Sequence, residues 1–255
     1  MRFALFVTSL LMIPASSLAA ECTARSGPNT AALVELYTSE GCDSCPPADR
    51  WFSSFASRAG VSPLVVPIAF HVDYWDYLGW KDVYAEARHS ERQRQVARSI
   101  GARAVYTPQV VLSGHDFAWR SAGVDGALEA VQARPARARL EIVSEAGPSA
   151  RVRASLNPGV RGDDLVLHVA ITQNGLVTQV KAGENRGETL RHDFVVRDMK
   201  TERRWSAADA PTLETRVDFS PRADWKLDRM TLVAFVQDTR TGEVLQALSS
   251  RVCGQ

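Results

Sequence analysis

The spacing of apolar residues changes once along this chain, and the change limits the folds that the chain can adopt. Before residue 134, short apolar runs alternate with longer stretches of helical composition. Beyond the segment RPARAR, at residues 134–139, apolar residues recur at every second position in short runs. The first pattern is typical of alternating strands and helices, and the second of antiparallel strands. The sequence therefore predicts an α/β domain followed by an all-β, sandwich-like domain.

The first half contains three short apolar runs that predict strands buried on both faces. They lie at residues 31–39, 64–72 and 109–114. Helices are expected from the cysteines at 42 and 45 through Phe55, at 80–100 and at 124–134. Eight or nine strands are expected after residue 138. The predicted division is a domain at 30–134 and an antiparallel β-sandwich domain at 138–253.

The first 20 residues have the layout of a secretory signal peptide. Arg2 precedes an apolar run that ends at Pro14, and small residues follow up to Ala20. The run is too short for a stable membrane anchor, so no membrane span is expected in the mature chain. Glu21 stands before Cys22 where lipid modification would require a small residue. We therefore predict a periplasmic or secreted protein in an oxidising compartment, where disulfides persist.

Charge gives no reason to expect a nucleic-acid or anionic-membrane partner. The full chain has 30 Lys and Arg residues against 29 Asp and Glu residues. Removal of the leader removes Arg2 and no acidic residue, which leaves 29 against 29. A basic patch that binds phosphates would need an excess of positive charge.

A Cys-x-x-Cys pair, Cys42 and Cys45, follows the first predicted strand and opens a helix. Backbone N–H groups and the helix dipole at such a position stabilise a thiolate. Pro46 and Pro47 are compatible with a first helical turn, whose N–H groups have no helical partner. The arrangement predicts a nucleophilic thiol at Cys42 with Cys45 as its resolving partner. The alternatives are a structural disulfide and a pair of metal-binding thiolates.

Pro108 follows Thr107 and directly precedes the third predicted strand. With Cys-Asp-Ser-Cys after the first strand, this Thr-Pro resembles the thioredoxin-like superfamily over roughly residues 31–133. In that superfamily a cis proline before this strand faces the cysteine pair. The resemblance implies an α/β thioredoxin-like fold and a place for Pro108 beside the cysteines.

Longer motifs resemble a family of secreted, thioredoxin-like bacterial proteins of unknown function. They are CDSCPPAD, FHVDYWD, YTPQ and, in the second half, GENRGETLRHDFVVR. This resemblance implies no established substrate. Gly41 stands where thioredoxins have Trp, and Asp43 lies between the cysteines, where its charge opposes thiolate formation. The segment from Tyr74 to Ala104 is longer than expected and is interpreted as a lid.

Several polar and aromatic residues follow the second predicted strand. His71 or Asp73 could transfer protons for the cysteines, with Tyr74 and Trp75 as walls for a substrate. The alternative is a strand-end turn with aromatic packing and a capping Asp. Glu184 and His192 in the second half could line a loop site.

Cys22 and Cys253 stand near the two ends of the mature chain. Domain termini often lie close together, so we predict a disulfide between them, against the alternative of two unrelated thiols. Closing so long a loop stabilises a fold by about 4 to 5 kcal/mol in the chain-entropy model.

The sequence as a whole predicts an exported thiol–disulfide oxidoreductase-like protein. Its partners would be protein thiols or disulfides of the cell envelope, and exchange would need no organic cofactor and no metal. One alternative is a module that binds or delivers Cu(I) through the same thiols. The other is a non-catalytic envelope protein with a structural disulfide.

Overall fold

The computed structural model describes residues 22–56, 64–121, 123–160, 164–201, 205–206, 208 and 210–253. Its α-helices are α1 (Pro46–Ser53), α3 (Ala87–Ser99) and α4 (Val124–Gln132). Its strands in chain order are β1 (Cys22–Arg25), β2 (Ala32–Thr38), β3 (Val65–His71), β4 (Gln109–Leu112), β5 (His115–Asp116), β6 (Ala138–Ser144), β7 (Ser149–Leu156), β8 (Leu165–Gln173), β9 (Leu176–Gln179), β10 (Thr189–His192), β11 (Val195–Thr201), β12 (Thr212–Asp218), β13 (Met230–Asp238) and β14 (Val244–Arg251).

One eight-stranded mixed sheet runs through both halves of the chain. Its strand order is β14-β13-β8-β11-β3-β2-β4-β5. Strands β2 and β3 are parallel, and β11 joins the outer edge of β3 in parallel through the pair Val195 and Ala69. Every residue of β2, β3 and β8 is buried, as expected for strands covered on both faces.

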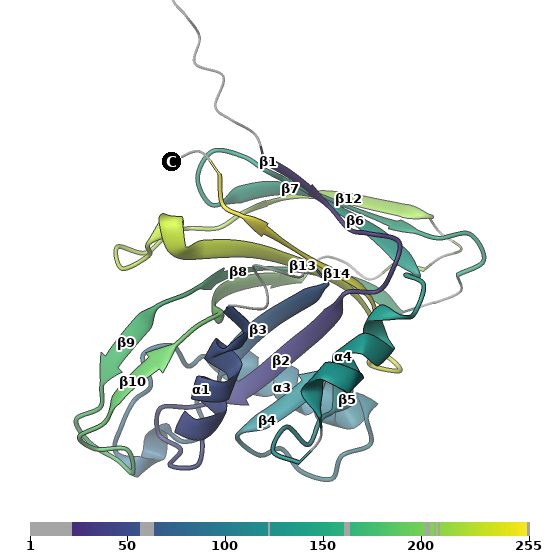
Figure 1. Ribbon diagram of the computed structural model, residues 1–255. Helices are drawn as coiled ribbons and strands as arrows, with labels where there is room; N and C mark the ends of the chain where they lie inside the picture. The colour runs from purple at the N-terminus through teal and green to yellow at the C-terminus, as the bar shows by residue number, and fades with distance from the viewer. Residues whose placement is uncertain are drawn as a thin grey trace, which may run out of the picture.

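Three sets of elements cover this sheet (Figure 1). Helices α1 and α4 pack on one face of β2 and β4 through residues such as Phe52 and Leu128. Helix α3 packs on the opposite face, where Val96 lies in one core cluster with Phe70 and Phe235. A second, four-stranded sheet of order β1-β6-β7-β12 covers the face of β8 and β13 that points away from α3. The result is a layered structure with strands from both halves at its centre.

The four-stranded sheet follows the expected alternation of buried and exposed residues. In β7, Ala150, Val152 and Ala154 are buried while Arg151 and Arg153 point outward. Its edge strand β1 is fastened by the disulfide between Cys22 and Cys253, whose Cα atoms are 5.9 Å apart. This is the disulfide predicted from the sequence, and it joins the four-stranded sheet to the end of β14.

Strands β9 and β10 form a separate two-stranded hairpin, here named the β9–β10 arm (residues 176–192). The arm lies beside α1 in Figure 1, and β10 contacts that helix. A segment of the second half therefore reaches the loop that carries Cys42 and Cys45.

The predicted fold class, an α/β thioredoxin-like domain followed by an all-β sandwich-like domain, was wrong. The described residues are mostly β, and β3 of the first half pairs with β11 of the second. The prediction treated each half as complete, yet the free edge of β3 is closed by a strand about 125 residues further along the chain. Whether residues 30–134 and 138–253 are separate domains stays a prediction.

Most predicted strands and helices are present, with local differences. The helix expected at 80–100 begins only at Ala87, because Asp82 bonds instead to the backbone N–H groups of Glu40 and Tyr84. Strands β1, β5 and β10 were not predicted. The predicted signal peptide at 1–20 lies outside the described residues. Among the described residues, no helix is both long and apolar enough to cross a membrane.

Candidate functional site: the Cys42–Cys45 loop

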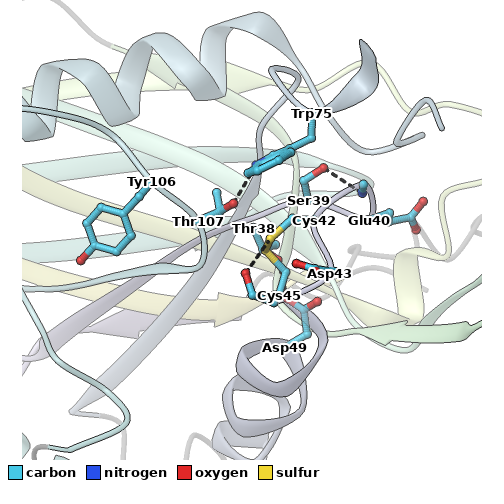
Figure 2. Close-up of a disulfide and its surroundings, with 12 residues drawn as sticks. Thr38, Ser39, Glu40, Cys42, Asp43, Cys45, Asp49, Trp75, Tyr106 and Thr107 are labelled. Atoms are coloured by element: carbon cyan, nitrogen blue, oxygen red, sulfur yellow. Dashed lines mark hydrogen bonds between the residues drawn. A yellow bond between two sulfur atoms is a disulfide. The ribbon is translucent and has the colours of Figure 1, made fainter. Parts of the chain in front are cut away.

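The two cysteines lie where β2 gives way to α1 (Figure 2). Strand β2 ends at Thr38, and α1 begins at Pro46 with Cys45 as its N-cap residue. Pro46 and Pro47 occupy the first two helical positions, where a missing N–H breaks no helical bond. The predicted link between the cysteines and a helix start is therefore confirmed.

Cys42 and Cys45 form a disulfide that is almost completely buried. Their Cα atoms are 5.5 Å apart, and the exposed fractions of the two residues are 1% and 0%. Asp43 and Ser44 between them are exposed, and Cys42 Sγ lies 3.4 Å from Ser44 Oγ. The loop thus reaches the surface while its sulfur atoms do not.

Trp75 lies against the cysteine loop on one side. A Cβ atom added to Gly41 would come within 3.1 Å of Trp75 Cβ, so the loop approaches Trp75 closely at the base of its side chain. The Trp75 Nε1–H donates a 2.7 Å hydrogen bond to Thr107 Oγ1, and the Thr107–Pro108 peptide is cis. Figure 2 shows Trp75 and Thr107 next to Cys42. Trp75 belongs to the segment that the sequence analysis interpreted as a lid.

A groove of 380 Å³ borders the loop at Ser44. Its lining includes Ser44, Thr107, Pro108, Phe117, Trp119 and Arg120. Arg120 lies over the Trp119 ring and donates a long hydrogen bond, 3.4 Å, to the carbonyl of Ser44. Aromatic walls and backbone at the rim suit an extended polypeptide better than a small charged molecule.

The β9–β10 arm holds the other side of the loop. The Asn185 side-chain N–H₂ group donates two hydrogen bonds of 2.9 Å, to the carbonyl oxygens of Glu40 and Cys42. The backbone N–H of Asp43 donates to Glu184 Oε2 at 3.3 Å. The conformation of the cysteine loop therefore depends on residues from the second half of the chain.

A buried set of carboxylates and imidazoles, named here the carboxylate–histidine cluster, lies behind the loop. Its members are Glu40, Asp49, His71, Asp82 and His192, each at most 5% exposed. His71 Nδ1 and Asp82 Oδ2 are 2.6 Å apart. His192 lies between two carboxylates, with Nε2 3.3 Å from Glu40 and Nδ1 3.7 Å from Asp49. Glu40 and Asp49 flank the cysteine motif in sequence, so His192 connects both ends of the loop.

Burial and pairing shift the pKa values of three members of this cluster. Burial raises the pKa of Asp49, against the opposing effect of His192, His71 and the Thr38 hydroxyl. Burial lowers the pKa of His71, but the charge and hydrogen bond of Asp82 outweigh it and the net pKa is raised. The pKa of Asp82 is lowered despite burial, because His71 lies beside it. We infer that His71 and Asp82 form a buried ion pair.

The predicted site residues fall into two groups. Thr107 and Pro108 line the groove beside the cysteine loop, while Trp75 bonds to Thr107 and approaches the loop at Gly41.

The other predicted residues have their main side-chain partners in α3 or in the carboxylate–histidine cluster. Asp73 accepts a short hydrogen bond from Ser90 of α3, and the Tyr74 hydroxyl donates to Gln93 of the same helix. His71 lies in the carboxylate–histidine cluster. Their roles in catalysis stay predictions.

Sequence reasoning missed Glu40, Asp49, Asp82 and Asn185. Glu40 and Asp49 look like ordinary charges at the ends of a helix in the sequence. Their burial depends on contacts with His192 of the β9–β10 arm, which lies far away along the chain. The motif GENRGETLRH, which contains Asn185, was the one signal that the second half belongs to the site.

Within the part of the chain that the structure describes, no group of three or more His, Cys, Asp or Glu side chains has a geometry that could hold a metal ion. No observation in the described residues favours the Cu(I) alternative.

Comparison with known proteins places the chain in a family of unknown function and finds similar folds in solved structures. The family model described as "Protein of unknown function (DUF1223)" matches residues 33–237. A crystal structure of protein AGR_C_4864 from Agrobacterium tumefaciens is 24% identical, with a TM-score of 0.62 over 90% of this chain and 97% of that one. HBP35 of Porphyromonas gingivalis is 13% identical, with a TM-score of 0.66 over 89% and 76% of the two chains. None of the curated proteins compared with this chain matches it.

Proposed function

We propose that this chain, which belongs to the DUF1223 family of proteins of unknown function, carries out thiol–disulfide exchange with partner polypeptides through Cys42 and Cys45. One observation carries the proposal. The disulfide closes at the start of a helix and borders, at Ser44, a groove with aromatic walls beside Pro108. The helix start favours a thiolate at this position.

The exchange proceeds in two steps when the cysteine pair starts reduced. The Cys42 thiolate attacks one sulfur of a partner disulfide, whose S–S bond breaks, and the leaving sulfur takes up a proton. The Cys45 thiolate then attacks Cys42 Sγ, which forms the Cys42–Cys45 bond and releases the second partner thiol. Two electrons pass to the partner, and the same steps in reverse oxidise a partner dithiol.

Access to the sulfur atoms requires the loop to open, since both cysteines are almost completely buried. The contacts that would have to loosen are those of Trp75 with Thr107 and of Asn185 with Glu40 and Cys42. We propose that a partner in the groove displaces Trp75 and so exposes Cys42. An exported location would supply partners with disulfides.

The burial of the same cysteines favours a second candidate function, a structural disulfide without exchange activity. Such a disulfide would resist thiols in the folded protein because no nucleophile could reach either sulfur.

Trapping of mixed disulfides separates the two candidates. The Cys45→Ser variant, incubated with a peptide that contains one disulfide, should accumulate a covalent adduct at Cys42, because the resolving thiol is absent. The Cys42→Ser variant should form far less adduct, and the double variant should form none at this loop. Absence of an adduct in Cys45→Ser, with Cys42 still alkylated after unfolding, would establish the structural candidate instead. Mass spectrometry of quenched samples provides the measurement.

A further inference from the structure

A second cavity of 380 Å³ lies between α3 and the eight-stranded sheet, and we name it the α3 cavity. Helix α3 contributes its outer wall with Arg92, Gln95, Val96 and Ser99. Facing side chains of neighbouring strands form its floor, because Thr201 and His168 are partners across β11 and β8, and Val166 and Gln237 across β8 and β13. This cavity shares no lining residue with the groove beside Cys42.

Arg92 brings a partly unused guanidinium to the cavity. Its side chain is 5% exposed, and its Nε and Nη2 donate to Glu35 at 2.9 and 2.7 Å. Among the described residues, its Nη1 has only Gln237 Oε1 as a partner, at 3.5 Å, and Nη2 reaches the same oxygen at 3.4 Å; both distances are near the limit of a hydrogen bond. The N–H donors of Arg92 that are weakly bonded therefore face Gln237, which also lines the cavity.

His168 lines the same cavity and brings a second side chain that can form a hydrogen bond with a ligand. It is 6% exposed and stacks on Phe235, with ring centroids 4.7 Å apart. Its Nδ1 lies 3.1 Å from Thr201 Oγ1, while Nε2 has no hydrogen-bond partner among the described residues. Burial, assisted by the charge of Arg92, lowers the pKa of His168 well below its ordinary value, so the ring is neutral. A neutral imidazole nitrogen can either donate or accept.

The formal charge in the cavity is already balanced. Arg92 is the one charged side chain in the described lining, and Glu35 pairs with it through two hydrogen bonds. A bound anion would compete with Glu35 for Arg92, and a bound cation would meet no carboxylate in the described lining, so either charge would lack a free partner. The cavity therefore favours an uncharged ligand that hydrogen-bonds.

We propose that the α3 cavity binds a small uncharged molecule with a planar amide or amide-like group. The carbonyl of such a group would accept from Arg92 Nη1, and its N–H would donate to His168 Nε2 or to the Gln237 side chain. The volume suits a ligand of one or two rings at the lower end of small-molecule sites. This site is independent of the cysteine pair.

Nicotinamide and nicotinate provide a matched pair of probes, because they share a ring and differ in charge. The chain contains five histidines, so its ring resonances can be resolved by NMR and assigned by single substitutions. Nicotinamide, with benzamide as a second amide, should shift the His168 resonances in a saturable manner. Nicotinate should bind at least about tenfold more weakly, the equivalent of 1.4 kcal/mol.

Two variants make the test specific. His168→Phe keeps a ring that can stack on Phe235 but removes the hydrogen bond. It should weaken nicotinamide binding about tenfold, measured from the backbone amide resonances of other lining residues such as Val166. His115→Phe, at an exposed position outside the cavity, should leave the affinity unchanged.

Three results would overturn the proposal. They are no shift of His168 with either amide, nicotinate binding at least as tightly as nicotinamide, or unchanged affinity in His168→Phe. The Cys42→Ser, Cys45→Ser double variant should bind nicotinamide normally, so this proposal and the exchange mechanism can fail separately.

Discussion

The two disulfides of this chain differ in nearly every physical respect. Cys22–Cys253 joins residues 231 positions apart, and Cys22 is exposed. Cys42–Cys45 joins residues three positions apart, is buried, and borders the carboxylate–histidine cluster. The long loop makes the first disulfide an effective constraint on the unfolded chain, whereas the second closes too short a loop to act mainly in that way. Stabilisation of the fold is therefore enough to explain the presence of Cys22–Cys253, but it is not enough to explain Cys42–Cys45.

Removal of Cys22–Cys253 should have the largest effect on stability. The Cys22→Ala, Cys253→Ala double variant should lose about 5 kcal/mol of unfolding free energy, because the unfolded chain regains the entropy of a long loop. Urea denaturation measures this loss. With Cys45→Ser added to this variant, adduct formation at Cys42 should persist wherever the protein remains folded, and its disappearance there would contradict the assignment of separate roles.

Acid should destabilise the folded protein through His89, which is buried in α3 beside the backbone carbonyl of His71. Burial lowers the pKa of His89 to about 4, below the value near 6.5 of an unfolded histidine. The unfolded chain therefore binds more protons between these values, so this contribution to stability is lost as pH falls from about 6.5 to 4 and regained as pH rises.

The size of this effect is on the order of 3 kcal/mol. Unfolding free energies at several pH values should show a smaller acid loss in His89→Gln than in the unaltered chain. The control His115→Gln, at an exposed histidine, should follow the unaltered chain. Identical pH profiles for all three proteins would refute the assignment to His89.

Removal of Cys42–Cys45 should cost less than half as much stability as removal of the long-range disulfide. The Cys42→Ala, Cys45→Ala double variant should lose about 2 kcal/mol in urea denaturation, since the loop that it opens is short. A loss equal to that of the Cys22, Cys253 variant would show that the buried pair is mainly structural.

Loosening of the β9–β10 arm should have the smallest effect on stability and a visible effect on reactivity. Asn185→Ala removes two hydrogen bonds to the cysteine loop and should cost about 1 to 2 kcal/mol. It should also accelerate reduction of Cys42–Cys45 by dithiothreitol. Asn157→Ala, which removes a side-chain bond to the carbonyl of Ala136, is the control and should leave the reduction rate unchanged. Equal rates in both variants would mean that the arm does not limit access.

The same contrast separates what the sequence could predict from what it could not. Local structure could be predicted from the sequence. Pro46 and Pro47 indicated a helix start beside the cysteines, and the alternation of apolar and polar residues in the second half indicated strands. The pairing of Cys22 with Cys253 followed from the position of both residues near the chain ends.

Contacts between segments that lie far apart in the chain could not be predicted from the sequence. The parallel pairing of Val195 with Ala69 joins two apolar segments that were each predicted as strands. No local sequence pattern specifies which strand will pair with the edge of another. His192 and Asn185 reach the cysteine loop only because the arm folds over α1, so the second half looked separate in the sequence. Burial of Glu40 and Asp49 depends on the same contact.

The reduction potential of Cys42–Cys45 tests the central claim most directly. Equilibration of the metal-free protein in glutathione buffers, followed by mass-spectrometric trapping of thiols, gives the potentials of both disulfides in one experiment. We predict a value of roughly −120 to −270 mV for Cys42–Cys45, the range of exchange catalysts, and a value below about −300 mV for Cys22–Cys253. A value below about −300 mV for Cys42–Cys45 as well would contradict the proposed exchange and mark both disulfides as structural.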